Sequence, residues 1–207
     1  MEIRLEGIGK RFRREWIFRN VNVEFSPAHR YAIVGSNGSG KSTLLHIISF
    51  LLFPTEGKIS CTEQKSVLQQ EDLPFLFSFS APYQELIEEF TGKEMFDFHF
   101  QFRNLTNSIS SKDFFEEIQL GGNEHKEIKY FSSGMKQRLR LALCAYTSAQ
   151  AYVLDEPSTN LDQVGIRWYQ RLMENIPSTK IVIISSNIKE EYHFCDTVLP
   201  LAHFKTH

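Results

Sequence analysis

Gly35-Ser-Asn-Gly-Ser-Gly-Lys-Ser-Thr43 matches the phosphate-loop pattern G-x-x-x-x-G-K-[S/T] without a gap. The loop follows the apolar run Arg30-Tyr-Ala-Ile-Val34, which predicts a buried strand, and it leads into a helix predicted over Lys41 to Leu52. In such a strand, loop and helix, glycines let the backbone turn its N–H groups toward an anion at the helix N-terminus. The sequence therefore predicts a phosphate-binding site.

Each polar residue of this loop has an expected role. We expect Lys41 to reach the β- and γ-phosphates of a nucleotide and the Ser42 hydroxyl to bind Mg²⁺. We also expect Lys41 to be exposed when no nucleotide is bound. The candidate nucleotide-binding residues of the loop are Gly35, Ser36, Asn37, Gly38, Ser39, Gly40, Lys41, Ser42 and Thr43. The predicted cofactors are ATP and Mg²⁺.

The composition is that of one folded domain without a nucleic-acid footprint. The chain has 207 residues, of which 42% are hydrophobic and 23% are charged, and its net charge is −2 with no basic block. The three cysteines, Cys61, Cys144 and Cys195, are scattered, which favours a reduced, cytosolic protein. No apolar run approaches the roughly 18 residues that a membrane-spanning helix needs.

A second element with chemical meaning is Ala151-Tyr-Val-Leu-Asp-Glu156, an apolar run that ends in two adjacent carboxylates. In a phosphate-loop protein, Asp155 would hold Mg²⁺ directly or through water, and Glu156 would polarise the attacking water. Phosphoryl transfer depends mostly on positioning and charge neutralisation, so these residues suffice chemically. The alternative is that the pair merely begins a turn before Pro157. The phosphate loop upstream favours the catalytic interpretation.

A third element suggests a family. Tyr130-Phe-Ser-Ser-Gly-Met-Lys-Gln-Arg138 precedes a helix predicted over 139–149. Together with the two preceding elements, it resembles the nucleotide-binding subunit of an ATP-binding cassette (ABC) transporter. Phe131-Ser-Ser-Gly-Met135 is similar to the family's L-S-G-G-Q signature, in which Ser132 and Gly134 match. By itself, a serine–glycine turn that caps a helix would explain the same residues.

The resemblance covers nearly the whole chain and implies further nucleotide contacts. Pro157-Ser-Thr-Asn-Leu-Asp162 resembles the family's D-loop, with Asp162 as its aspartate. Phe12 corresponds to the aromatic residue that stacks on adenine, with Trp16 as the alternative, and either side chain could simply be packing.

The resemblance also implies a Q-loop, whose glutamine binds nucleotide and Mg²⁺. It falls within Phe79-Ser-Ala-Pro-Tyr-Gln84, where Gln84 is the candidate ligand and Tyr83 is the alternative occupant of that position.

The largest departure from the family is at its switch histidine. Lys180-Ile-Val-Ile-Ile-Ser-Ser-Asn187 contains the expected strand, but Asn187 stands where the family has His. An amide can donate a hydrogen bond to the γ-phosphate but carries no charge near neutral pH. Asn187 therefore joins Glu156 and Lys41 as a catalytic candidate, with slow hydrolysis as one consequence. The alternative is that Asn187 caps a helix expected over 188–193.

The expected fold is a single α/β phosphate-loop NTPase domain of the ABC ATPase type over 1–207, with a mixed sheet core, an antiparallel β subdomain and a helical subdomain. Alternating apolar residues within 2–34 predict half-buried antiparallel strands. By the resemblance, 1–81 and 150–207 form the nucleotide-binding core with its antiparallel part, and 84–149 form the helical subdomain that carries the signature. Helix-like stretches lie at 84–90 and 112–118.

The segment Met95 to Arg103 gives conflicting signals. Its phenylalanines alternate with period two, which favours a strand, whereas the resemblance implies a helix with some of these rings exposed. Two interpretations remain open, which are ordinary packing within the subdomain and a docking surface for a cytosolic helix of a membrane partner.

The resemblance implies that the chain binds and hydrolyses ATP as the motor subunit of an ABC transporter, in the cytoplasm and peripheral to the inner face of the cell membrane. Its implied partners are an integral membrane permease subunit and a second copy of itself or a paralogous ATPase subunit. In that dimer, Ser132 and Gly134 of one subunit would close over the γ-phosphate that Lys41 of the other holds. The alternatives are a soluble accessory ATPase, such as those of iron–sulfur assembly, and a weakly hydrolysing ATP-dependent switch.

Overall fold

The strands form two sheets, and the computed structural model describes them within residues 1–64, 66–69, 71 and 73–204. The central sheet contains β3 (Arg30–Val34), β6 (Phe77–Ser80), β7 (Ala151–Asp155), β8 (Ile181–Ser185) and β9 (Thr197–Pro200). The second sheet contains β1 (Glu2–Phe12), β2 (Glu15–Phe25), β4 (Glu56–Glu63) and β5 (Ser66–Val67). Residues 65, 70, 72 and 205–207 of the expected domain lie outside the described residues.

The central sheet has the order β6-β7-β8-β3-β9, and its described strand pairs are parallel. The second sheet has the order β2-β1-β4-β5 with antiparallel pairs. The two pairing modes that the sequence indicates therefore occupy separate sheets, rather than one mixed sheet. The antiparallel strands over residues 2–34 are the expected β1 and β2, and β3 has the predicted bounds.

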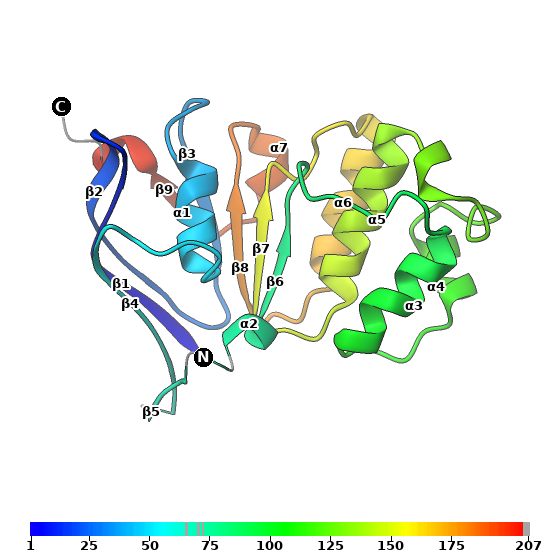
Figure 1. The fold of residues 1–207 in the computed structure, drawn as a ribbon, viewed down its shortest axis with the longest axis horizontal. Helices are drawn as coiled ribbons and strands as arrows, with labels where there is room; N and C mark the ends of the chain where they lie inside the picture. The colour runs from blue at the N-terminus through cyan, green and yellow to red at the C-terminus, as the bar shows by residue number, and fades with distance from the viewer. Residues whose placement is uncertain (65, 70, 72, 205–207) are drawn as a thin grey trace.

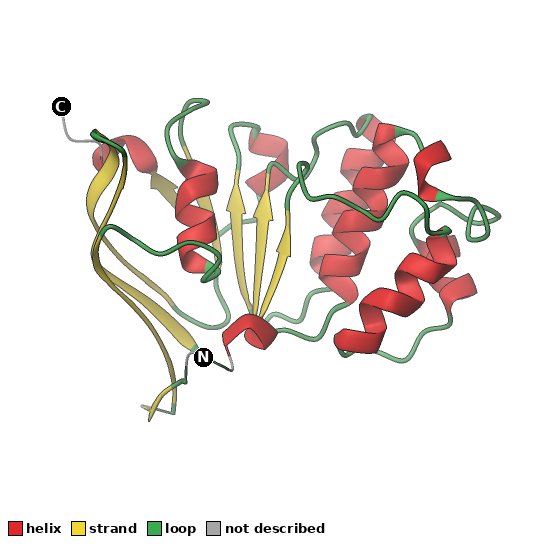
Figure 2. Ribbon diagram, in the orientation of Figure 1, coloured by secondary structure: helices red, strands yellow, loops and turns green. Residues whose placement is uncertain are grey.

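The helices cover both faces of the central sheet (Figures 1 and 2). They are α1 (Lys41–Ile48), α2 (Leu73–Leu76), α3 (Gly92–Phe102), α4 (Ser111–Glu117), α5 (Ser133–Tyr146), α6 (Gln163–Glu174) and α7 (Lys189–Tyr192), with 3₁₀ turns η1 (Ile128–Tyr130) and η2 (Leu201–Phe204). In Figure 1, α1 lies between the central strands and the antiparallel sheet, whereas α5 and α6 lie on the other side with α3 and α4 beyond them. None of the helices in the described part of the chain is long and apolar enough to cross a membrane.

Strand β7 shows why the amino-acid sequence of a central strand is a continuous run of apolar residues. Tyr152 and Leu154 pack into the core that contains α5 and α6, whereas Ala151 and Val153 pack into the core that contains α1 and the antiparallel sheet. Because helices or strands cover both faces, every residue of β7 is buried. The predicted division into a core and a helical subdomain at 84–149 stays a prediction.

One predicted helix is shorter than expected, and another does not form. Helix α1 ends at Ile48 rather than Leu52, because Phe50 has a φ of 59° and the N–H groups of Leu51 and Leu52 donate back to the carbonyl of His46. The predicted helix over 84–90 is absent from the structure. The backbone there pairs with a distant segment instead, since the carbonyls of Glu88 and Phe90 accept from residues 129 and 128 at 2.9 and 2.8 Å. The stretch predicted over 112–118 is α4. The helix predicted over 139–149 corresponds to α5, which begins at Ser133 because the Ser132 side chain caps it there, and which ends at Tyr146.

The phenylalanine-rich segment is the helix α3. A capping box begins it, in which the Thr91 side chain accepts from the N–H of Glu94 and the Glu94 carboxylate accepts from the N–H of Thr91. Phe96 is buried, whereas Phe98 and Phe102 are 40% and 64% exposed. The alternating phenylalanines therefore do not mark a strand. They arise because this helix has an exposed aromatic face next to a buried one.

Candidate nucleotide-binding site

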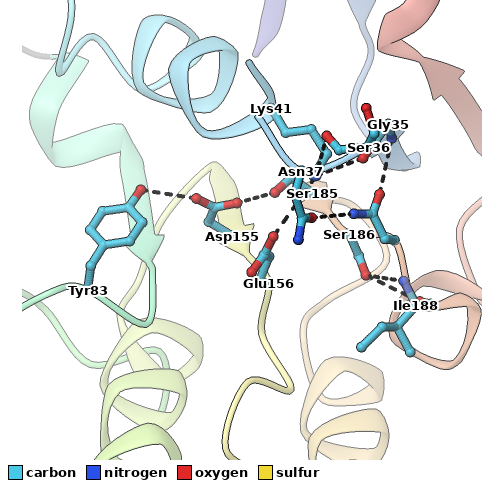
Figure 3. Close-up of polar contacts among 11 residues, drawn as sticks. Gly35, Ser36, Asn37, Lys41, Tyr83, Asp155, Glu156, Ser185, Ser186 and Ile188 are labelled. Carbon is cyan, nitrogen blue, oxygen red and sulfur yellow. Dashed lines mark hydrogen bonds and ion pairs between the residues drawn. The ribbon is translucent and has the colours of Figure 1, made fainter. Parts of the chain in front are cut away.

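The candidate site lies at the carboxyl ends of the parallel strands, where open α/β sheets bind their ligands. The loops that follow β3, β6, β7 and β8 meet there, and Figure 3 shows the polar contacts that join them. Each loop follows a buried strand whose pairing with its neighbours fixes where the loop begins.

The phosphate loop has two features that fit an anion. Helix α1 begins after Gly40, whose φ of 102° suits glycine, and no side chain caps its first N–H groups among the described residues. The Ser39 hydroxyl is buried and has no hydrogen-bond partner in the described structure. Uncapped N–H groups and an unpaired hydroxyl beside a helix N-terminus are the donors that a phosphate group needs.

Lys41 is buried, contrary to our expectation that it would be exposed. Its side chain is only 4% exposed, and its ammonium group donates to the carbonyls of Gly35 at 2.8 Å and Ser36 at 3.4 Å. The side chain folds back across the loop because these two carbonyls satisfy a charge that water does not reach. The ammonium group also lies 4.0 Å from a carboxylate oxygen of Glu156, so it joins the phosphate loop to the end of β7.

Asp155, the last residue of β7, is 1% exposed and is held by two hydroxyl groups. One carboxylate oxygen accepts from the Ser185 hydroxyl, and the other accepts from the Tyr83 hydroxyl at 3.0 Å (Figure 3). The Tyr83 oxygen also lies 3.0 Å from Nε2 of His46. Burial and then the charge of Asp155 raise the pKa of Tyr83, so its hydroxyl keeps the proton that it donates.

Tyr83, and not Gln84, is the residue that reaches Asp155. The Gln84 side-chain oxygen turns back to accept from the N–H of Ala81 at 3.3 Å, and the Gln84 backbone carbonyl accepts from Arg140 at 2.6 Å. In this arrangement the side-chain oxygen is directed to the backbone of its own loop, and the expectation that Gln84 contacts Mg²⁺ and nucleotide stays a prediction.

The Ser42 hydroxyl and the Asp155 carboxylate are oxygen donors of the kind that Mg²⁺ prefers. The Tyr83 hydroxyl donates to one oxygen of that carboxylate. We therefore expect Tyr83→Phe to tighten Mg²⁺ binding to the ATP complex by up to about tenfold, since a hydrogen bond to a charged group contributes roughly 1.5 kcal/mol. Calorimetric titration of Mg²⁺ at saturating ATP measures this, with Tyr192→Phe as the control. Weaker Mg²⁺ binding in Tyr83→Phe would show instead that the hydroxyl supports the metal.

Glu156 has an unusual backbone conformation. Its φ is 43°, in the left-handed region that non-glycine residues adopt only under constraint. Its N–H donates to the carbonyl of Ser185 at 2.9 Å, and its side chain is 43% exposed on the side of Lys41 (Figure 3). The turn thus directs a partly solvated carboxylate toward the phosphate loop.

Asn187 faces the phosphate loop rather than capping a helix. Its side-chain oxygen accepts from the N–H of Gly35 at 3.4 Å, and its amide group donates to the side chain of Asn37 at 2.8 Å. The N-cap of α7 is Ile188, whose N–H donates to the Ser186 hydroxyl at 2.8 Å. The capping interpretation of Asn187 is therefore not what the structure contains.

Comparison with known proteins agrees with this geometry. The sequence profile of the ABC transporter family matches residues 18–159. The chain belongs to the ABC transporter family. Membership confirms the predicted family, the α/β fold class and the ATPase class of activity.

Individual relatives are similar over most of this chain. The ABC transporter ATP-binding protein YcbN of Bacillus subtilis is 26% identical over 95% of this chain, which spans 65% of YcbN. The lantibiotic transport ATP-binding protein SrtF of Streptococcus pyogenes is 28% identical over 95% of this chain and 85% of its own. The solved dimeric structure of the ATP-binding cassette MJ0796 with ADP and Pi has a TM-score of 0.80 at 20% identity and covers 96% of this chain and 93% of its own. The last similarity concerns the fold alone.

Phe12 and Trp16, the two candidates for stacking on adenine, lie at the β1–β2 hairpin. Phe12 is 47% exposed, with the ammonium group of Lys10 at 5.1 Å from its ring centroid. The ring of Trp16 already contacts the guanidinium groups of Arg11 and Arg19, at 5.1 and 4.2 Å. The exposed ring of Phe12 is therefore the better candidate for stacking on a base.

The signature residues lie at the start of α5. The Ser132 side chain accepts from the N–H of Met135 at 3.2 Å, so in this chain it caps the helix. Gly134 faces the D-loop, where a Cβ would lie 3.1 Å from the carbonyl of Asn160. Asp162 caps α6 by accepting from the N–H of Gly165 at 2.7 Å. No contact among the described residues joins Ser132 or Gly134 to the phosphate loop of the same chain.

Sequence reasoning missed two residues that hold the site together. Ser185 donates to Asp155, and His46 contacts Tyr83, yet neither belongs to a motif. The first was detectable only from strand order, because Ser185 pairs with Asp155 across β7 and β8. His46 carried no signal, since nothing in its spacing along the chain indicates a contact with Tyr83.

Proposed function

We propose that this chain binds ATP with Mg²⁺ and hydrolyses it as the motor subunit of an ABC transporter, at the cytoplasmic face of a membrane. One observation supports the proposal, which is that two separate segments, the end of β7 and the loop after β8, meet at the phosphate loop. Lys41 belongs to the loop itself, Glu156 lies 4.0 Å from its ammonium group, and Asn187 bonds to Gly35 and Asn37.

Each residue has a role that its environment supports. Lys41 and the uncapped N–H groups of α1 bind the phosphates, and Ser42 with Asp155 would hold Mg²⁺, which neutralises charge on the phosphate oxygens. Glu156 accepts a hydrogen bond from the attacking water and so orients it. Asn187 can offer its amide N–H to the terminal phosphate without adding charge.

We further propose that the site is completed by a second ATPase subunit, either another copy of this chain or a paralogue. Ser132 and Gly134 have no contact with the phosphate loop of their own chain among the described residues, and Gly134 has no side chain to obstruct a partner. The MJ0796 cassette, which shares this fold, is described as a dimer bound to ADP and Pi.

A membrane permease subunit is the second proposed partner. A cavity of about 280 Å³ opens between the central sheet and the helices, lined in part by Leu51, Pro74, Met95, His99 and Arg103. Leu51, Phe75 and Phe102 are more than 60% exposed beside it. Burial, aided by the charge of Arg103, lowers the pKa of His99 to about 4, so this wall is uncharged at His99. A groove that combines exposed apolar side chains with polar ones suits an amphipathic helix of a partner.

Phosphate release, measured with and without detergent-solubilised membranes from cells that express the chain, tests the proposal. We expect MgATP-dependent release, an increase on adding the membrane fraction, and co-purification of a membrane protein that Phe102→Glu weakens. Full release without any membrane partner would favour a soluble accessory ATPase. Binding of ATP without release under either condition would overturn the proposed hydrolysis.

Substitutions of Asn187 distinguish a motor ATPase from a weakly hydrolysing switch. Because a serine side chain cannot span the contacts to Gly35 and Asn37, we expect Asn187→Ser to lower the hydrolysis rate by about tenfold, equivalent to roughly 1.4 kcal/mol. The melting temperature should barely change, since α7 does not use this side chain as a cap. Asn187→His should raise the rate. An unchanged rate in Asn187→Ser would place the phosphate sensor elsewhere.

A further inference from the structure

The strained turn at Glu156 requires restraint from its surroundings. A non-glycine residue at a φ of 43° is strained, and such strain persists only where neighbouring contacts over-determine the backbone. Two backbone bonds contribute, from the N–H of Glu156 to Ser185 at 2.9 Å and from the N–H of Thr159 to Glu156 at 3.2 Å. Neither bond fixes the two residues that follow Glu156 directly.

Two buried side chains hold those residues from opposite directions. The Gln137 amide, on α5, donates to the carbonyl of Pro157 at 2.8 Å. The Glu191 carboxylate, on α7, accepts from the N–H of Ser158 at 2.7 Å. Gln137 and Glu191 are 0% and 1% exposed, so no water can replace either contact without opening the core.

The side chain of Gln137 and the backbone of Glu191 are themselves anchored. Arg140 lies 3.5 Å from the Gln137 side-chain oxygen and also donates to the carbonyl of Gln84. The Tyr169 hydroxyl, on α6, donates to the carbonyl of Glu191 at 2.9 Å. Burial raises the pKa of Glu191, although hydrogen bonds from Ser158 and Ser186 oppose the shift. Burial disfavours the charged form of this carboxyl group. Its hydrogen bond with the N–H of Ser158 accounts for its position in the core.

We propose that Gln137 and Glu191 are positioning residues, which hold Pro157 and Ser158 and thereby fix the carboxylate of Glu156 beside the phosphate loop. This inference rests on the proposed function, because it gives Glu156 its catalytic role. The two side chains act on the turn and not on the nucleotide, since their described contacts are with Pro157, Ser158 and neighbouring structural groups. Their loss should therefore affect the hydrolysis step and leave ATP affinity unchanged.

Four variants test this. Gln137→Met and Glu191→Met keep approximate shape and remove the hydrogen bond to the turn. Glu191→Gln keeps an oxygen that can accept from Ser158, and Glu190→Met removes an exposed carboxylate from the same helix as the control. Single-turnover hydrolysis, calorimetric ATP affinity and amide hydrogen exchange at residues 156–160 are measured on the full chain.

We expect both Met variants to lower the single-turnover rate by about tenfold or more with ATP affinity within about twofold of wild type. Exchange of the Ser158 amide should accelerate by about tenfold or more. Glu191→Gln should recover the rate to within about threefold, and Glu190→Met should behave as wild type.

Three results would overturn the inference. The first is an equal loss of ATP affinity and rate, the second is unchanged exchange at Ser158, and the third is Glu191→Gln as slow as Glu191→Met. If Glu191→Met does not fold, Glu191→Asp withdraws the carboxylate by one methylene and is judged by the same readouts. A wild-type chain that does not hydrolyse ATP would instead defeat the proposed function, while hydrogen exchange would still decide whether the two side chains hold the turn.

Discussion

Glu156→Gln is expected to lower ATP hydrolysis by about a hundredfold or more while ATP binding is retained, because a positioned carboxylate contributes roughly 10²–10⁴-fold by accepting a proton in the transition state. The amide has the same size and can occupy the same turn. The side chain is 43% exposed, so the substitution should scarcely alter stability. It also removes the negative charge 4.0 Å from the Lys41 ammonium group, which can only favour phosphate binding.

The accumulation of an ATP-bound dimer is the corresponding physical readout. If two subunits close over ATP and hydrolysis separates them, Glu156→Gln should elute from size-exclusion chromatography with MgATP as a larger dimer fraction than wild type. Glu174→Gln, an exposed carboxylate at the end of α6, is the matched control. A Glu156→Gln variant that hydrolyses ATP at the wild-type rate would mean that another group orients the water.

The parts of the site that the sequence could predict are those that local chain geometry determines. The phosphate loop needs particular glycines at fixed spacing, and Gly40 does adopt a φ of 102°. Strand β7 needs apolar residues on both of its faces. The end of the apolar run in the sequence therefore predicted the end of the strand at Asp155.

The parts that could not be predicted depend on which segments become neighbours. Strand order places Ser185 against Asp155, and the turn after β6 places Tyr83 between Asp155 and His46. No spacing along the chain encodes either contact. Periodicity also failed in α3, because four alternating phenylalanines suggest a strand unless the capping box at Thr91 is weighed first.

The burial of Lys41 changes what its replacement should do. The ammonium group serves two purposes, since it would face the nucleotide phosphates and it already satisfies the carbonyls of Gly35 and Ser36. Lys41→Ala should therefore weaken ATP binding by tenfold or more, which is about 1.4 kcal/mol or greater. It should also lower the free energy of unfolding by about 1 kcal/mol, because the half-buried carbonyl of Gly35 loses its charged donor.

These two effects can be separated in one set of measurements. Calorimetry gives the ATP affinity of the folded protein, and denaturant unfolding without nucleotide gives the stability change. Lys41→Arg keeps the charge but not the compact ammonium group that fits between Gly35 and Ser36, so it should bind ATP less tightly than wild type and more tightly than Lys41→Ala. Unchanged affinity in a folded Lys41→Ala variant would mean that this loop does not bind phosphate. That result would also contradict the proposed function.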